Sequence, residues 1–429
     1  MSLVRPVTER LNLFQQMMGR WESVHPYNAA HIIRLRGSPD FQSLQRAIET
    51  GCSAAGVGEL AVDYERGELT YHDAQSVSLE QLPDGADLHQ VVSEQTNNPF
   101  PKGWHHPLRW GLLRAADRRS YFLLATYHHV AADGYAIQTL IADILSRYAG
   151  TKPRYPLAVG VPGYDQVMQH HYRRLGYLPT FIETLGQFLR MRRAYRMRES
   201  RGVDEGTEFC TYSAPAGLID ALAHACRASR ASVNDAFVAA LGISIAQIKA
   251  PSRRQNRNRI AVGNIVNVRP WAGQDLSRYF GLYLGNLVTL MESCSGGDLR
   301  SLLGQVTCQS RAQKQRCYPA GPQWNFMLIK YLWPVMRISN TRRNYLRIYP
   351  LSGGLSNINL NRSPLAGNPL ILDYCRACPP GPILPFVVGP TTWGSQLNVS
   401  VVFRSASLKR ERIDALIERF LGELQRFSE

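Results

Sequence analysis

A short apolar run in the first third of the chain limits the fold more than any other feature. Residues 121–127 read Tyr-Phe-Leu-Leu-Ala-Thr-Tyr, and a near-continuous apolar run of this length is typical of a β-strand buried on both faces. Soon afterwards apolar side chains recur with helical spacing, at Ile137, Leu140, Ile141, Ile144 and Leu145. We therefore predict a central strand that ends at a histidine pair, His128 and His129, with a helix beginning just after it.

Strands and helices are predicted in both halves of the chain. A helix is expected over residues 42–50, another over residues 232–247 that opens at Ser232, and a strand over residues 260–268. The alternating residues Leu397, Val399, Val401 and Phe403 predict a strand, followed by a helix from Ser407. With 429 residues, the chain is long enough for two lobes. We expect an α/β protein with an N-terminal lobe over residues 1–200 and a C-terminal lobe over residues 201–429.

A basic stretch is expected to connect the two lobes. Residues 172–201 place Phe181, Leu185, Phe188 and Leu189 on one helical face and then become rich in arginine. We interpret this stretch as a basic helix that ends in a loose linker around residues 198–208. A solvated surface helix and a docking or membrane-surface helix are both compatible with the pattern.

The net charge of +16 suggests an acidic partner, such as nucleic acid, an anionic membrane or an acidic carrier protein. The sequence has no zinc-knuckle spacing, no RNA-binding aromatic signature and no long tract of lysine and arginine, so we expect no nucleic acid. A second apolar-basic stretch, Phe326 to Arg347, could also lie on an anionic membrane.

The expected location is the cytoplasm, with peripheral membrane contact as the alternative. The N-terminus lacks the apolar core of a signal peptide. The uncharged stretch Pro379 to Phe403 is interrupted by prolines and glycines, which favours strands and turns over a membrane span. The eight cysteines are expected to be reduced thiols, and Cys375 and Cys378 form a CxxC pair with no histidine after it, so no metal is expected.

The histidine pair is compatible with core packing, a metal site or catalysis. Adjacent strand residues point to opposite faces, so His128 and His129 cannot both face one metal or substrate, and one of them must have a supporting role. Asp133 could cap the following helix or pair with a cation. Gly134 allows a tight backbone there.

The segment His128-His129-Val130-Ala131-Ala132-Asp133-Gly134 resembles the HHxxxDG motif of the condensation-domain and thioester-dependent acyltransferase superfamily. Further similarities lie at Pro107-Leu108-Arg109, Ser232-Val233-Asn234-Asp235, Asn267-Val268-Arg269-Pro270 and Gly285-Asn286. The resemblance implies two chloramphenicol-acetyltransferase-like lobes that meet in a V around a central channel. It also implies that His129 is the catalytic residue and that Asp133 pairs with Arg269 in a structural role, supported by His128 and Gly134.

Family likeness implies acyl transfer from a thioester, with no bound cofactor. The expected donor is acyl-coenzyme A or an acyl group on the phosphopantetheine of an acyl carrier protein, and the acceptor is an amine or hydroxyl. Two alternatives stay open. One is acylation of a lipid alcohol at a membrane, because Leu355-Ser356-Asn357 resembles an SN-containing segment of the wax-ester synthases. The other is a catalytically silent carrier-binding scaffold.

Overall fold

The computed structural model describes most of the chain: residues 6–72, 77–154, 156–159, 164, 168–169, 171, 173, 176–197, 206–249, 257–292, 298–316, 324, 326–327, 330, 351–381 and 383–429. The chain forms two compact units, and neither is continuous in sequence. Unit 1 comprises Met1–Gln169, Asn267–Leu284 and Asn359–Ala377, and unit 2 comprises His170–Val266, Gly285–Ile358 and Cys378–Glu429. The predicted lobe boundary near residue 200 stays a prediction, because residues 198–205 lie outside the described residues.

Unit 1 is built on a five-stranded sheet with the order β13-β2-β7-β6-β5. Neighbouring strands are antiparallel except for β5 and β6, which are parallel. The strands are β2 (Asn28–Arg36), β5 (Leu79–Gln81), β6 (Leu108–Arg114), β7 (Ser120–His128) and β13 (Ile371–Ala377). The predicted strand over residues 121–127 is thus confirmed as the central strand β7, since β2 and β6 pair with its two edges.

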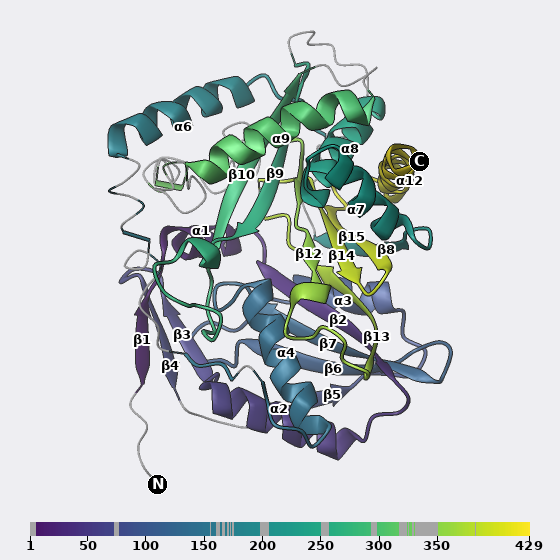
Figure 1. The fold of residues 1–429 in the computed structure, drawn as a ribbon. Helices are drawn as coiled ribbons and strands as arrows, with labels where there is room; N and C mark the ends of the chain where they lie inside the picture. The colour runs from purple at the N-terminus through teal and green to yellow at the C-terminus, as the bar shows by residue number, and fades with distance from the viewer. Residues whose placement is uncertain are drawn as a thin grey trace. The chain divides into compact units, whose positions relative to one another are not determined.

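Helices cover both faces of this sheet (Figure 1). Helices α2 (Phe41–Ala55) and α4 (Gly134–Tyr148) pack against each other, and α4 contacts β2. Helix α3 (Leu88–Asn97) contacts β2 and β7 from the opposite face. The predicted apolar stripe of α4 is confirmed, because Ile137, Leu140, Ile141, Ile144 and Leu145 are all fully buried.

A smaller antiparallel sheet and one further helix complete the described core of unit 1. The small sheet has the order β1-β4-β3, with β1 (Val7–Arg10), β3 (Glu59–Asp63) and β4 (Glu68–His72). Helix α1 (Leu13–Glu22) begins at a capping box in which the side chains of Asn12 and Gln15 each accept from the other residue's backbone N–H.

Unit 2 is built on a larger mixed sheet with the order β10-β9-β11-β14-β15-β8, and β12 also pairs with β14. The central strand β11 is parallel to both of its neighbours, whereas β14, β15 and β8 are antiparallel. The strands are β8 (Thr207–Ser213), β9 (Arg259–Asn267), β10 (Leu284–Glu292), β11 (Gly353–Leu355), β12 (Ile358–Asn359), β14 (Phe386–Trp393) and β15 (Gln396–Arg404).

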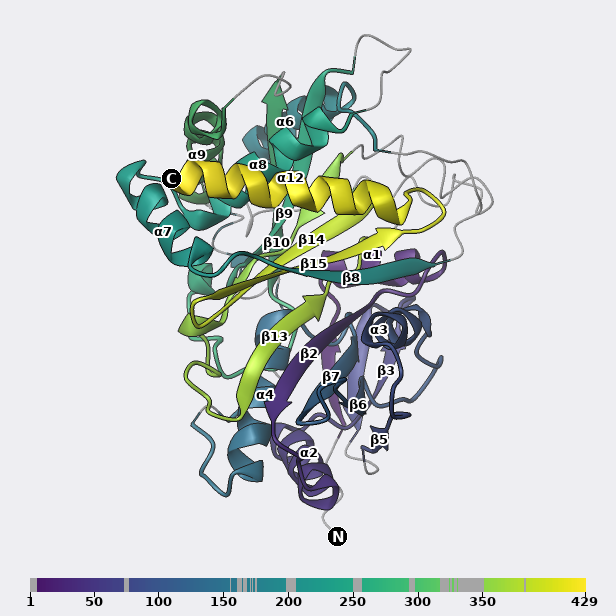
Figure 2. The same ribbon diagram turned by 90° about the vertical axis from the view of Figure 1, so that its right-hand side faces the viewer.

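Four helices of unit 2 bury their apolar faces in one continuous core with this sheet. They are α7 (Leu218–Ala228), α8 (Val233–Gln247), α9 (Leu299–Gln315) and α12 (Arg410–Ser428). Helix α12 lies along β14, β15 and β8 in Figure 2 and contacts α7 and α8. The short 3-10 helices η1 (Arg269–Trp271) and η4 (Leu360–Arg362) belong to unit 1.

Most of the sequence-predicted elements are confirmed in type. The helix expected over residues 42–50 is the longer α2, the helix capped by Ser232 is α8, and the strand over residues 260–268 is β9. The stretch read as strands and turns, Pro379 to Phe403, contains β14 and β15. The last helix begins at Arg410 rather than Ser407, because residues 405–407 form a turn after β15.

The prediction of a basic connecting helix is confirmed only in part. Helix α6 (Tyr177–Met191) is present, but it ends before most of the arginines. Its apolar residues Leu185 and Leu189 are exposed rather than packed on the core. Residues 331–350, which include most of the second apolar-basic stretch, lie outside the described residues. Over the part of the chain that the structure describes, no helix has both the length and the apolar character to cross a bilayer.

Candidate active site

His129 lies immediately after the end of β7, in the turn that leads to α4. Its backbone N–H donates to the carbonyl of Tyr27 (3.3 Å). The imidazole lies between two tyrosine rings, 5.4 Å from that of Tyr27 and 5.3 Å from that of Tyr127 between centroids. The side chain is thus held by the end of the sheet while remaining partly accessible.

Burial lowers the pKa of His129 from its ordinary value. The backbone carbonyls of His129 and Ala132 and the carboxylate of Asp133 oppose this shift, whereas His128 adds to it. Nδ1 is buried and has no well-formed hydrogen bond among the described residues. The neutral imidazole is therefore the favoured form near neutral pH, as a general base requires.

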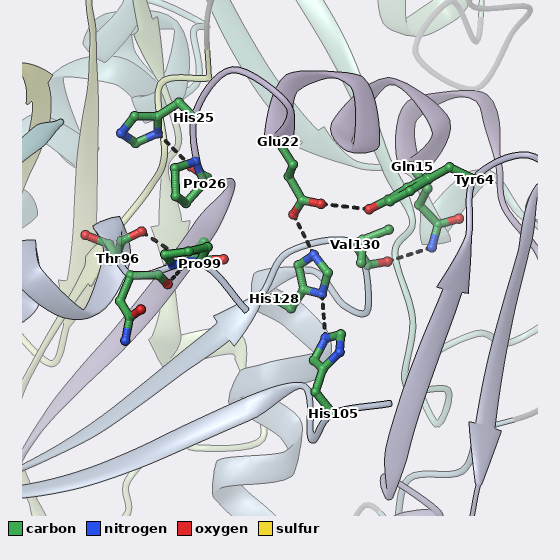
Figure 3. A network of polar contacts seen from close by, with 12 residues as sticks. Gln15, Glu22, His25, Pro26, Tyr64, Thr96, Pro99, His105, His128 and Val130 are labelled. Atoms are coloured by element: carbon green, nitrogen blue, oxygen red, sulfur yellow. Dashed lines mark hydrogen bonds and ion pairs between the residues drawn. The ribbon is translucent and has the colours of Figure 1, made fainter. Parts of the chain in front are cut away.

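His128 points to different neighbours and belongs to a hydrogen-bonded chain of side chains (Figure 3). Its Nε2 lies 2.5 Å from Oε1 of Glu22, at the end of α1, and its Nδ1 lies 3.0 Å from Nε2 of His105. Tyr64 donates its hydroxyl proton to Oε2 of Glu22 (2.8 Å). The ring of His128 also stacks on Phe100 at 5.3 Å between centroids.

The directions of these hydrogen bonds fix the number of protons in the chain. Nδ1 of His105 must donate to the carbonyl of Gly103 (2.9 Å), and burial lowers the pKa of His105 to about 4. Nε2 of the neutral His105 is then an acceptor, so Nδ1 of His128 carries a proton. A second proton must lie between Nε2 of His128 and Glu22. One proton therefore links His128 and Glu22 across this short contact.

Asp133 is completely buried and joins three parts of unit 1. Its Oδ1 accepts from the N–H of Ala136 and caps α4 (3.0 Å). Its Oδ2 accepts from Nη1 of Arg269 (2.6 Å) and from the N–H of Tyr283 (2.8 Å). The structure thus brings together Asp133 and Arg269, and Asp133 has both contacts that the sequence suggested for it, the helix cap and the cation.

Arg269 is held on every side. It donates to the backbone carbonyls of Leu276 (3.3 Å) and Gly281 (3.2 Å). Its guanidinium also lies over the rings of Tyr135 and Tyr283, 4.7 and 4.8 Å from their centroids. These contacts, together with the ion pair to Asp133, hold the guanidinium within the segment Asn267–Leu284.

Two further contacts shape the loop between β7 and α4. Gln15 of α1 donates to the carbonyl of Val130 (2.7 Å), which anchors the loop to the helix that carries Glu22 (Figure 3). Gly134 has no left-handed φ, so its expected role in a tight backbone is not required by the dihedral angle. A Cβ at this position would lie 3.4 Å from Nε2 of His31, so the small residue lets that imidazole approach the start of α4.

Several residues around the site were not singled out by sequence reasoning. His31 of β2 is buried, and its Nδ1 forms a hydrogen bond with the hydroxyl of Tyr374 of β13 (2.5 Å). Burial lowers the pKa of His31, and the charge of Arg376 lowers it further. Glu22 and His105 were missed as well. His31 is a polar residue next to the apolar pair Ile32 and Ile33, a signal that could have marked it. Arg376, Glu22 and His105 carry no such local signal.

A metal centre has no support among the described residues, in which no group of three or more histidine, cysteine, aspartate or glutamate side chains could hold an ion. Cys375 lies in β13 and Cys378 just after it, and both have intermediate exposure and are in no disulfide.

The comparisons with known proteins concern the family and the fold of the chain. The family model described as "Condensation domain" matches residues 2–322. Tyrocidine synthase 3 of Brevibacillus parabrevis is 28% identical over 158 residues, which are 34% of this chain and 2% of that protein. Isonitrile lipopeptide synthase of Mycobacterium tuberculosis is 31% identical over 136 residues, 29% of this chain and 5% of that protein. The chain therefore spans only a small part of the length of these relatives.

Solved structures share the fold over almost the whole chain. The X-domain from teicoplanin biosynthesis has a TM-score of 0.65 at 16% identity and covers 100% of this chain and 96% of its own. TRI3 trichothecene 15-O-acetyltransferase from Fusarium sporotrichioides has a TM-score of 0.73 at 12% identity and covers 99% and 95%. At these identities the likeness shows the fold alone.

The fold is one that condensation domains and an acetyltransferase of known structure share. The chain belongs to the condensation-domain family, whose model matches about three quarters of it. The mixed α/β fold class expected from the resemblance is confirmed by the described sheets and by these structures.

Proposed function

We propose that this protein transfers an acyl group from a thioester to an amine or hydroxyl, with His129 as the general base. The observation that supports this most directly is the position of His129: a partly accessible imidazole at the end of the central strand, with its pKa lowered by burial. Because Nδ1 is buried, Nε2 is the nitrogen that an acceptor would reach.

The chemistry needs little more than this base. A thioester carbonyl is already electrophilic, so the protein has to hold donor and acceptor together and remove one proton. As the acceptor oxygen or nitrogen bonds to the carbonyl carbon, its proton moves to His129. The carbon–sulfur bond then breaks, and the imidazolium returns the proton to the departing thiolate. In this scheme Asp133, Arg269, Gly134 and His128 keep the loop in place and touch no substrate.

Two donors fit this proposal: an acyl-coenzyme A and an acyl group on the phosphopantetheine of a carrier protein. Coenzyme A carries phosphates and carrier proteins are acidic, so the net charge of +16 favours the approach of either one. The match to peptide synthetases supports the carrier-bound donor, because those proteins are the relatives found in sequence. No resident cofactor is part of the scheme.

Two other functions have an observation in their favour. Acylation of a lipid alcohol at a membrane is supported by the exposed apolar residues of α6, such as Leu178 and Ile182. A binding module without catalysis is supported by the similar X-domain, which has also been solved in complex with OxyB. The intact pair of His129 and Asp133 favours catalysis over this last alternative.

Intact-mass detection of acyl transfer tests the proposal. The purified protein is offered acyl-coenzyme A and acyl-carrier donors with a mixed panel of amines and alcohols. We expect product with the wild type and a loss of about 100-fold or more for His129→Ala, the usual scale of general-base catalysis. The matched control is His224→Ala, which removes an exposed histidine of α7 and should keep full activity.

Each outcome has a distinct meaning. Equal product from His129→Ala and the wild type would remove His129 as the base. Stable binding of an acylated carrier protein by both variants, without turnover of any donor, would favour the binding module instead.

A further inference from the structure

Helix α6 presents its apolar side chains to the outside of unit 2. Five of the large hydrophobic side chains that are exposed in the described part of the chain belong to this one helix. Their exposed fractions are 55% for Tyr177, 68% for Leu178, 60% for Ile182, 41% for Leu185 and 53% for Leu189.

These residues form one continuous stripe. Leu178, Ile182, Leu185 and Leu189 are spaced by four, three and four positions, which places them on one face of an α-helix. We call this set the α6 stripe. The helix has 15 residues and so extends for about 22 Å.

Apart from Met191, the buried residues of α6 are polar, which is the reverse of an ordinary surface helix. Thr180 and Thr184 are buried, and Gln187 donates to the carbonyl of Val288 in β10 (3.2 Å). Beneath the helix lies a cavity of about 500 Å³, which Glu183, Gln187 and Arg190 line together with residues of β10 and α9. Met191 is buried, and Tyr177 and Phe181 contact the ring of Trp324. These contacts do not account for the exposed residues of the α6 stripe.

Basic residues accompany the stripe. Arg190, Arg192 and Arg193 are exposed at the C-terminal end of α6. The acidic side chain nearest the middle of the helix, Glu183, is paired with Arg316 of unit 2 (3.1 Å), so its charge is compensated. An apolar stripe beside a cluster of arginines is the pattern of a helix that lies in the interface of an anionic bilayer.

We propose that α6 binds the surface of an anionic membrane, with the α6 stripe buried among the acyl chains and the three arginines among the headgroup phosphates. The occupant is a lipid bilayer because an apolar stripe about 22 Å long with cations at its end matches the acyl chains and the anionic headgroups of such a surface. This proposal goes beyond acyl transfer and stands even if His129 is not a base.

Vesicle co-sedimentation tests the proposal with the complete protein. The wild type is mixed with phosphatidylcholine vesicles or with vesicles of phosphatidylcholine and phosphatidylglycerol. We expect binding to the anionic vesicles that weakens with salt. Replacing the α6 stripe by glutamine (L178Q, I182Q, L185Q and L189Q together) should weaken it by about tenfold or more.

Two controls keep the test decisive. Trp104→Gln removes an apolar side chain that is 51% exposed in unit 1 and should bind like the wild type. The single variant Leu178→Glu changes the most exposed residue of the stripe. Leu178→Glu should also weaken binding. It tests the stripe even if the fourfold variant loses its helix, a loss that circular dichroism would detect.

Several results would overturn the proposal. Equal vesicle binding by the wild type, the fourfold variant and Leu178→Glu would show that the α6 stripe is not the contact. Absence of wild-type binding to both vesicle types would exclude a membrane. If the wild type instead forms dimers that the fourfold variant abolishes, with no vesicle binding, the stripe is a contact between two copies of the chain.

Discussion

Nη1 of Arg269 donates to Oδ2 of Asp133 at 2.6 Å across 136 positions of sequence. The side chains are 5% and 0% exposed, and the same carboxylate caps α4 through Ala136. One buried anion therefore holds the histidine loop, the first turn of α4 and the segment Asn267–Leu284 in register.

Asp133→Ala should destabilise unit 1 and remove activity together. The change leaves the guanidinium of Arg269 buried without a counter-charge, for which a loss of about 3–5 kcal/mol in the free energy of unfolding is expected. Denaturant unfolding measures this loss. The control Asp84→Ala breaks the solvent-exposed pair with Arg114 and should cost less than about 1 kcal/mol. A soluble, fully active Asp133→Ala protein would contradict the structural role of the pair.

The pH dependence of kcat/KM should follow the protonation of His129. Its pKa is lowered by burial, and the base acts only when neutral. Activity is then full above the ordinary histidine pKa of 6.5 and is lost only when the pH falls through a lower value. Values of kcat/KM measured between neutral and acid pH give the position of this fall, the acid limb of the pH profile. An acid limb above the ordinary value would be inconsistent with a buried base.

Glu22→Gln should move the same acid limb toward higher pH. With the carboxylate gone, an amide N–H can donate to Nε2 of His128, so His128 no longer needs its second proton. The positive charge beside His129 that lowers its pKa is then removed. Tyr64→Phe keeps the carboxylate of Glu22 and removes one donor to it, so its acid limb should stay near that of the wild type. A purely structural Glu22 would lower the rate in Glu22→Gln without moving the limb.

Two helical glycines should respond in opposite directions to alanine. A Cβ at Gly51 of α2 would lie 2.6 Å from Cγ1 of the buried Ile144 of α4, and such overpacking costs about 1–3 kcal/mol. A Cβ at Gly304 of α9 would meet nothing within 4 Å, so alanine should stabilise that helix by up to about 1 kcal/mol. Thermal unfolding of the two variants gives the comparison, and a stabilised Gly51→Ala would show that α2 and α4 can separate without cost.

The elements that were predicted well carry their signal within a few neighbouring residues. The run over residues 121–127 and the spacing from Ile137 to Leu145 gave β7 and α4, because burial on a strand or a helix face repeats at short range. Helix α6 shows the limit of this reasoning. Its periodicity was found, but a periodic pattern does not say whether the apolar face turns inward.

The candidate site was predictable only where a motif spans it. The histidine loop and its link to Arg269 followed from family resemblance. Glu22 lies 106 positions from His128 and contacts it only in the folded chain. His105 lies 23 positions from His128, in the segment just before β6. No local pattern joins these residues, so their shared proton became visible only from distances and hydrogen-bond directions.

The pairing of β13 with β2 has a consequence for the order in which the protein can be made. Strand β2 ends at Arg36, whereas the strand that covers its outer edge ends at Ala377. During synthesis the ribosome must release more than three hundred further residues before that edge is covered. Until then the apolar strand around Ile32 and Ile33 offers unpaired backbone groups to any other nascent chain. The nascent chain is thus open to misassembly at β2 until β13 has been synthesised and has paired with it.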